Sequence, residues 1–276
     1  MTAPGKAPEI SVGIVSGTTI TFTLSGNFTD PNSGLTLDGM WTALYHEEKI
    51  FFRKNDLTVD AGTGITLVPE THDNAHFILH AVTIGINFHW QRNEDQSFKG
   101  KLKFIVENGK LTAVNILSIE DYLVSVISSE MSATSSAELL KAHAVISRSW
   151  LLAQTEKTLQ LEKESAEYRT SFITGDEITR WYDREDHQNF DVCADDHCQR
   201  YQGITRASTP IVEKAVSDTC GELLSYGEAI CDARYSKCCG GLTELFENVW
   251  EPVNHPYLQS VNDNPVPPQG FSLDLT

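Results

Sequence analysis

The stretch "SVISSEMSATSSAELLKAHAVISRSW", residues 125–150, contains two helical patterns joined by a short polar link. Just upstream, Ser118 is placed to cap the first helix, with Asp121 three residues later as a capping-box-like partner. Glu130 ends this helix on the face where apolar side chains recur at helical spacing. Those apolar side chains are Ile119, Tyr122, Leu123 and Val126. The sequence therefore predicts a carboxyl group directed toward apolar surroundings.

Such a carboxyl group is a candidate general acid. Burial disfavours its charged form, and a general acid must hold a proton before it can donate it. In the second pattern, Ser135 is the expected cap and Glu138 its partner. Lys141 and Arg148 then fall on one stripe of the helix, where they could hold an anionic or polyhydroxylated ligand beside Glu130. The alternative is that all three charged side chains are simply solvated.

Length and charge narrow the function classes. The chain has 276 residues, 40% of them apolar, which is enough for a sizeable core. Because 38 acidic residues face 21 basic ones, nucleic acids and anionic membrane surfaces are disfavoured as partners. No apolar run is long enough for a transmembrane segment. The N-terminus lacks a signal peptide pattern, so we expect the cell envelope or periplasm if a signal was removed, and the cytoplasm otherwise.

The first part of the chain reads as strands separated by Gly, Asn, Asp and Pro. Asn108-Gly109 predicts a hairpin with a type I′ turn. We therefore expect an α+β protein with a β-rich N-terminal region at residues 1–113, a mixed helix/strand domain at 114–263 and an irregular tail at 264–276. The expected strand segments are 8–15, 19–26, 49–55, 64–70, 76–90 and 100–117.

The helical stretch also resembles a known family. "EDYLVSVISSEMSATSSAELLKAHAVISRSW", residues 120–150, is similar to the signature of the stage II sporulation protein D family, also called the SpoIID/LytB or amidase-enhancer family. The resemblance resumes at "CADDHCQRYQG", residues 193–203, and continues to "HPYLQSVND", residues 255–263. Departures include His143 where the family has Gln, and Leu242 where Arg is common.

The resemblance implies a peptidoglycan lytic transglycosylase that cleaves glycan strands to 1,6-anhydro-muramic products. It places the catalytic acid and base on Glu130 and substrate positioning on Lys141 and Arg148. No cofactor is implied for catalysis. Other members enhance a cell-wall amidase, so the alternative is a non-catalytic wall-binding protein that stimulates an N-acetylmuramoyl-L-alanine amidase.

A second family motif carries further candidates for substrate binding. They are Tyr235, Gly240, Gly241 and Thr243. Paired glycines let the backbone approach a ligand closely, so this loop is a candidate wall of the glycan cleft. A tight turn is the alternative. Aromatic residues that could stack on sugar rings, or else belong to the core, are Trp181, Tyr182, Trp250 and Tyr257. His89 and Trp90 are read as packing residues.

The segment "DHQNFDVCADDHC", residues 186–198, offers a set of metal ligands. His187, Cys193, His197 and Cys198 could bind zinc tetrahedrally, and the resemblance also implies zinc at these positions. Four protein ligands leave no open position, so this zinc would be structural and a zinc-dependent hydrolase is disfavoured. A Cys193–Cys198 disulfide is the alternative. The remaining cysteines, which allow three complete pairings, are Cys220, Cys231, Cys238 and Cys239.

Overall fold

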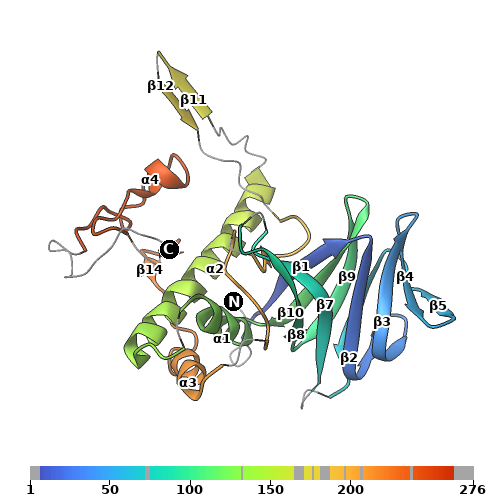
Figure 1. The fold of residues 1–276 in the computed structure, drawn as a ribbon. Coiled ribbons are helices and arrows are strands. Elements are labelled where there is room, and N and C mark those ends of the chain that lie inside the picture. Colours follow the sequence, from blue (N-terminus) through green and yellow to red (C-terminus); the bar gives the residue numbers. More distant parts are fainter. Residues whose placement is uncertain are drawn as a thin grey trace. The chain divides into compact units, whose positions relative to one another are not determined.

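The structure is a computed structural model in which the chain forms an α+β fold (Figure 1). It describes residues 7–71, 75–86, 88–131, 133–164, 171–175, 177–180, 187–195, 197–205, 208–236 and 239–263. Trp181, Tyr182, Cys238 and the tail at 264–276 lie outside these residues. Two compact units are present, one of Met1–Arg148 with His187–Glu222 and one of Ser149–Asp186 with Leu223–Thr276. The expected boundary after residue 113 falls inside a strand, and the sequence-based boundaries stay a prediction.

The first unit is built on an 11-stranded sheet. Its strand order is β13-β1-β10-β9-β6-β2-β3-β4-β5, and β7 pairs with both β2 and β8. Its strands are β1 (Glu9–Gly17), β2 (Thr19–Thr29), β3 (Thr36–His46), β4 (Lys49–Lys54), β5 (Leu57–Asp60), β6 (Gly64–Pro69), β7 (His76–Ile84), β8 (Arg92–Phe98), β9 (Lys101–Glu107), β10 (Lys110–Ser118) and β13 (Val192–Cys193). Its helices are α1 (Ile119–Glu130), the first part of α2 (Ala137–Glu164) and α3 (Pro210–Asp218).

The second unit contains the rest of α2 and short elements. These are β11 (Ser171–Thr174), β12 (Glu177–Arg180), β14 (Ser225–Tyr226), β15 (Ala229–Ile230) and α4 (Phe246–Val249). Each pair of short strands forms its own two-stranded sheet. Among the described residues, no helix combines the length and apolar character required to cross a membrane.

The β-rich prediction is confirmed, with corrections to individual strands. Asn108 and Gly109 both have positive φ angles, of 50° and 70°, as a type I′ turn requires. The strand expected over 76–90 ends at Ile84, because Gly85 turns the chain with a φ of 65°. Strands β3, β5 and β8 were not expected. β8, "RNEDQSF", contains one apolar residue, Phe98, so its sequence lacks the apolar alternation that predicts a strand buried on one face.

Aromatic rings connect the sheet to α1. Phe22 of β2, Phe52 of β4 and Phe104 of β9 pack together with ring centroids 5.1–5.4 Å apart, so they join separate strands in one core. A second contact series runs to the helix. The Tyr201 ring lies 5.9 Å from that of Phe98 and 5.1 Å from that of Tyr122 on α1. α1 is therefore held on the sheet by buried rings rather than by its own propensity alone.

Serine hydroxyl groups cap the first turns of α1 and α2. The Ser118 hydroxyl accepts a hydrogen bond from the Asp121 backbone N–H at 3.1 Å, so the predicted cap of α1 is confirmed. α2 begins at Ala137, and the Leu139 N–H donates to the Ser136 hydroxyl at 3.4 Å. Ser136, rather than the expected Ser135, therefore caps the second helix.

Candidate active site and metal cluster

Glu130 is the last residue of α1, and its side chain is 19% exposed. The Arg200 backbone N–H donates to Glu130 Oε1 at 3.0 Å. His143 Nε2 lies 3.2 Å from Glu130 Oε2. The two carboxyl oxygens thus contact different segments of the first unit, which restricts the orientation of the side chain. The predicted position of Glu130 on the inward side of α1 agrees with this limited exposure.

His143 comes from the second turn of α2, and its side chain is 1% exposed. Its ring nitrogen can donate to a carboxylate or accept from a protonated carboxyl, so the pair can hold one proton in either arrangement. Sequence reasoning singled out His143 only as a departure from the family. The short link between two helices was the available signal, because it makes the helices neighbours and brings the start of the second close to the end of the first.

Arg200 belongs to the segment 197–205, which is hydrogen-bonded to both α1 and β8. The Gln202 N–H donates to the Ser125 hydroxyl on α1 at 3.2 Å. The Ile204 N–H donates to the Ser97 carbonyl on β8 at 2.7 Å. Between them, Gly203 has a φ of 57°, and a Cβ there would lie 2.2 Å from the Ser97 carbonyl oxygen. Only glycine fits this approach, so the segment is closely seated between α1 and β8.

Lys141 is tied to α3. Its Nζ lies 3.1 Å from Asp218 Oδ2 and 3.9 Å from Glu138 Oε1. The hydrogen bond to Asp218 raises the pKa of Lys141 above its ordinary value. Lys214 also pairs with Asp218, at 2.7 Å. Lys141 therefore has an ionic partner from α3, and its role in substrate positioning stays a prediction.

Arg148 occupies a different place from the expected one beside Glu130. Its side chain is only 2% exposed and forms a two-pronged ion pair with Glu120, at 3.0 Å and 2.7 Å. Its third nitrogen donates to the Glu222 carbonyl at 3.1 Å. Glu120 lies in the first turn of α1, so at 1.5 Å per residue Arg148 is bound roughly 15 Å along the helix from Glu130. Helical spacing predicts one stripe for Lys141 and Arg148. In the structure Lys141 binds Asp218 of α3, whereas Arg148 binds Glu120 of α1.

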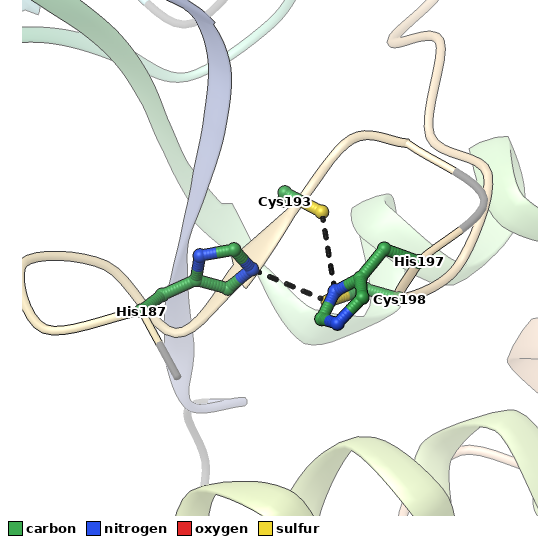
Figure 2. A group of neighbouring side chains, drawn as sticks. All are labelled: His187, Cys193, His197 and Cys198. Atoms are coloured by element: carbon green, nitrogen blue, oxygen red, sulfur yellow. Dashed lines mark hydrogen bonds between the residues drawn. The ribbon is translucent and has the colours of Figure 1, made fainter. Parts of the chain in front are cut away.

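The four predicted metal ligands come together in the first unit (Figure 2). Their ligand atoms all lie within 4.8 Å of one another. Cys198 Sγ lies 3.4 Å from His197 Nδ1 and 3.6 Å from His187 Nε2, and Cys193 Sγ lies 3.9 Å from His197 Nδ1. Ligand atoms around a tetrahedral zinc ion are about 3.3–3.8 Å apart, given bonds of about 2.0–2.3 Å. The donor set and its spacing therefore fit zinc.

The thiols in this cluster are not joined. Cys193 and Cys198 are both free cysteines, so the structure contains no Cys193–Cys198 disulfide. Hydrogen bonds from Cys198, His187 and His197 hold the pKa of the Cys193 thiol well below its usual range. A thiol that loses its proton readily is suited to metal binding, because the thiolate is the ligand form.

β1 supports the cluster from one side. β13 pairs with β1 in parallel, with Cys193 opposite Gly13. A Cβ on Gly13 would lie 2.6 Å from the Phe190 ring, so the absence of a side chain there makes room for that ring. The Phe190 ring in turn stacks on His187, with centroids 4.6 Å apart. Asp191 anchors the segment by accepting from the Ser11 N–H and hydroxyl, both at 2.7 Å.

The second predicted group lies in the second unit. Gly240 and Gly241 have φ angles of 71° and 100°, which L side chains rarely adopt. Thr243 Oγ1 accepts from the Val261 N–H at 2.7 Å, and the Asp263 N–H donates to the Gly241 carbonyl at 2.9 Å. This geometry is that of a tight turn paired with residues 259–263. The part of Tyr235, the glycines and Thr243 in a cleft wall stays a prediction.

Trp250 and Tyr257, the predicted aromatic residues that the structure describes in the second unit, have protein partners. The Arg234 guanidinium lies 4.5 Å from the centre of the Trp250 ring, and the Tyr257 hydroxyl accepts from the Asp232 N–H at 3.0 Å. The cysteines described outside the metal cluster are all free thiols. They are Cys220, Cys231 and Cys239.

The Glu130 carboxyl is largely shielded and is held by an imidazole and a backbone amide, so it is a candidate acid–base group. The His/Cys cluster is a candidate metal site. Residues 107–226, which include both features, match the family model described as Stage II sporulation protein. This match supports assigning residues 107–226 to the SpoIID family.

Two curated proteins are similar to part of the chain. An uncharacterized protein of Brachyspira hyodysenteriae is 30% identical over 164 residues, which are 59% of this chain and 37% of that protein. Stage II sporulation protein D of Bacillus subtilis is 27% identical over 151 residues, which are 54% of this chain and 39% of that protein. The chain thus spans less than two-fifths of either relative. The family supports a function related to the cell wall.

Proposed function

We propose that this chain is a lytic transglycosylase that cleaves peptidoglycan glycan strands with Glu130 as both acid and base. The observation that carries the proposal is the restraint on the Glu130 carboxyl. One oxygen meets the Arg200 N–H and the other meets His143, while 19% of the side chain stays open to a ligand. An acid–base catalyst must be both oriented and reachable in this way.

The chemistry requires one carboxyl group. Protonated Glu130 donates its proton to the glycosidic oxygen as the bond from that oxygen to C1 of the muramic sugar breaks. The resulting carboxylate then takes the proton of the C6 hydroxyl, whose oxygen bonds to C1 of the same sugar. The products are a shortened strand and a 1,6-anhydro end, and Glu130 regains its proton. A hydrolytic glycosidase commonly uses two carboxyl groups, because water must be activated or a covalent intermediate formed.

His143 and Arg200 have complementary roles in this proposal. The Arg200 N–H stabilises negative charge on Oε1 after the proton has left, since a backbone donor favours a carboxylate. In the tautomer protonated at Nε2, His143 can donate to Oε2 in both states of Glu130, which leaves the acidic proton of Glu130 for the glycosidic oxygen. His143 is thus a positioning residue that can serve both halves of the cycle without touching the sugar.

We also propose a structural zinc ion held by His187, Cys193, His197 and Cys198. When bound, zinc would cross-link the segment that leads directly to Arg200. Cys193 and Cys198 lie seven and two residues before Arg200 in the sequence, and the Arg200 amide contacts Glu130. The cluster's contribution to the reaction would therefore be to hold the Arg200 backbone in place.

A wall substrate implies that the protein works in the cell envelope, with glycan strands as its partner. Mass spectrometry of glycan strands incubated with the protein tests the function. Products that end in 1,6-anhydro-muramic sugars are expected. Reducing ends would instead identify a hydrolase. Intact strands, together with faster cleavage by an added wall amidase, would favour the enhancer alternative.

A further inference from the structure

The connection between β7 and β8 presents aromatic side chains outside the core. The rings of Phe88 and Trp90 stack with centroids 5.6 Å apart and planes inclined by 15°. Phe88 is 52% exposed and neighbouring Ile86 is 48% exposed. Gly85 has a φ of 65°, and a Cβ there would lie 2.2 Å from the Trp90 ring. The Trp90 ring therefore packs directly on backbone, which fixes the position of the aromatic pair.

Arg200 links this pair to the candidate acid. Its guanidinium carbon lies 4.9 Å from the centre of the Trp90 ring, while its backbone nitrogen lies 3.0 Å from Glu130 Oε1. An extended arginine spans roughly 7 Å from backbone nitrogen to guanidinium carbon. The Trp90 ring is thus within roughly 15 Å of the Glu130 carboxyl, a separation that a short oligosaccharide can bridge.

The chemistry of this surface suits a sugar. Pyranose rings have faces of C–H groups that pack on flat aromatic rings, and hydroxyl groups at their edges that accept hydrogen bonds from a guanidinium. Exposed apolar side chains in a group commonly mark a ligand site. Arg200 contacts both the Trp90 ring and Glu130, so the glycan cleaved at Glu130 is the favoured ligand of this aromatic surface.

We infer that Phe88, Trp90 and the Arg200 side chain form a sugar-binding subsite for the glycan strand that Glu130 cleaves. This inference rests on the proposed function. It gives the N-terminal β-rich region, whose sequence resembles the family poorly, a direct part in substrate binding. Trp90, expected from sequence to be a packing residue, becomes the centre of the subsite.

The test measures binding separately from cleavage. All variants are made in full-length Glu130→Gln protein, and binding to glycan strands freed of stem peptides is measured by calorimetry. Phe88→Ala and Trp90→Ala should each weaken binding by about 3–10-fold, the effect of losing one aromatic contact. Trp90→Phe should recover part of the loss. Leu57→Ala is the matched control, because Leu57 is 56% exposed on the separate strand β5 and should not affect binding.

The outcomes distinguish the subsite from the reaction. Unchanged binding in folded Phe88→Ala and Trp90→Ala proteins would overturn the subsite and leave the proposed reaction standing. Weakened binding in these variants would support the subsite. If the protein with Glu130 intact does not cleave glycan strands, the transglycosylase proposal falls while the subsite stands. Circular dichroism melting identifies any loss caused by unfolding, and Phe88→Ala, at an exposed position, keeps the test decisive if Trp90→Ala does not fold.

Discussion

At the scale of single residues, two glutamate carboxyl groups of α1 lie in contrasting electrostatic surroundings. Glu120 and Glu130 stand at the two ends of α1. Glu120 lies in the first turn, where a negative charge is favourable, and there it binds a buried guanidinium. Glu130 lies at the last turn, where the helix dipole disfavours negative charge, and there it meets a histidine and an amide. The first arrangement stabilises a charge, whereas the second orients a carboxyl that gains and loses a proton in the proposed reaction.

His143 allows this orientation to be tested. His143→Ala removes the partner of Oε2 and should lower the rate of strand cleavage at least about tenfold, since a hydrogen bond to a charged group contributes about 1.5–3 kcal/mol. His143→Gln keeps an N–H donor, so it should recover much of the rate.

The control for this prediction is His46→Gln, because His46 is exposed and lies on β3. Its rate of strand cleavage should match that of the unaltered protein. If folded His143→Ala protein also cleaves strands at the unaltered rate, then His143 has no part in orienting Glu130.

Arg148 leads to a prediction about stability. Arg148→Ala would leave Glu120 without its buried partner and the Glu222 carbonyl without a donor. Breaking a buried pair costs about 3–5 kcal/mol, and the partial exposure of Glu120 places the expected loss near the lower end. Urea unfolding measures this loss. Lys214→Ala, which removes an exposed pair with Asp218, should cost less than about 1 kcal/mol.

The combined replacement Glu120→Gln with Arg148→Met gives a sharper comparison. It removes both charges and should recover much of the stability, because an unpaired buried charge is costlier than none. If Arg148→Ala unfolds at the same urea concentration as the unaltered protein and yet loses glycan binding, the ion pair is not structural and the substrate role expected from sequence is favoured.

At the scale of elements, the segment 197–205 positions the backbone amide that contacts Glu130. It contains two residues of the His/Cys cluster and is hydrogen-bonded to α1 and β8. Gly203 is the tightest point of this junction. Gly203→Ala should destabilise the protein, since the added methyl group would meet the Ser97 carbonyl at 2.2 Å in addition to the strain of a positive φ. Gly62→Ala is matched, because Gly62 has a φ of 73° and no atom within 4 Å of an added Cβ.

Melting temperatures compare these two variants. The strain of the backbone alone is about 1–2 kcal/mol, so Gly62→Ala sets the baseline and Gly203→Ala should exceed it clearly. Equal losses would mean that the segment moves away from β8 without cost, and that it does not fix the Arg200 amide.

Sequence patterns predict some of these elements and miss others for physical reasons. The hairpin at Asn108-Gly109 and the cap at Ser118 depend on local backbone chemistry, so they were predictable. Polar β8 was not, because its pairing with β7 is decided by tertiary contacts. The stripe shared by Lys141 and Arg148 follows from helical spacing, but what the stripe faces depends on α3 and α1.

The candidate site was partly predictable in the same way. Glu130 could be found because its spacing follows the apolar face of α1, and the His/Cys set because its residues are close in sequence. For His143 the only signal was the short link between the two helices. The Arg200 backbone amide could not be found, since its role comes from packing between segments and not from residue type.

At the scale of the whole molecule, the proposed zinc site would connect the stability of the fold to the position of Glu130. Metal analysis of protein purified without added zinc should find close to one equivalent. Chelation should then lower the melting temperature, since a metal that binds only the folded state stabilises it. Cys193→Ser should reproduce the effect, while Cys239→Ser, outside the cluster, should not. Absence of metal together with a Cys193–Cys198 disulfide in the purified protein would contradict the zinc proposal.

The central claim is that Glu130 carries the proton of the reaction, and the rate of glycan cleavage by Glu130→Gln tests it most directly. Glutamine keeps the shape of the side chain but cannot supply or recover the proton. Because a general acid typically contributes about 10²–10⁴-fold, the account expects a loss of at least this size, with the melting temperature unchanged or raised. Cleavage at the normal rate to 1,6-anhydro products by folded Glu130→Gln protein would contradict the account.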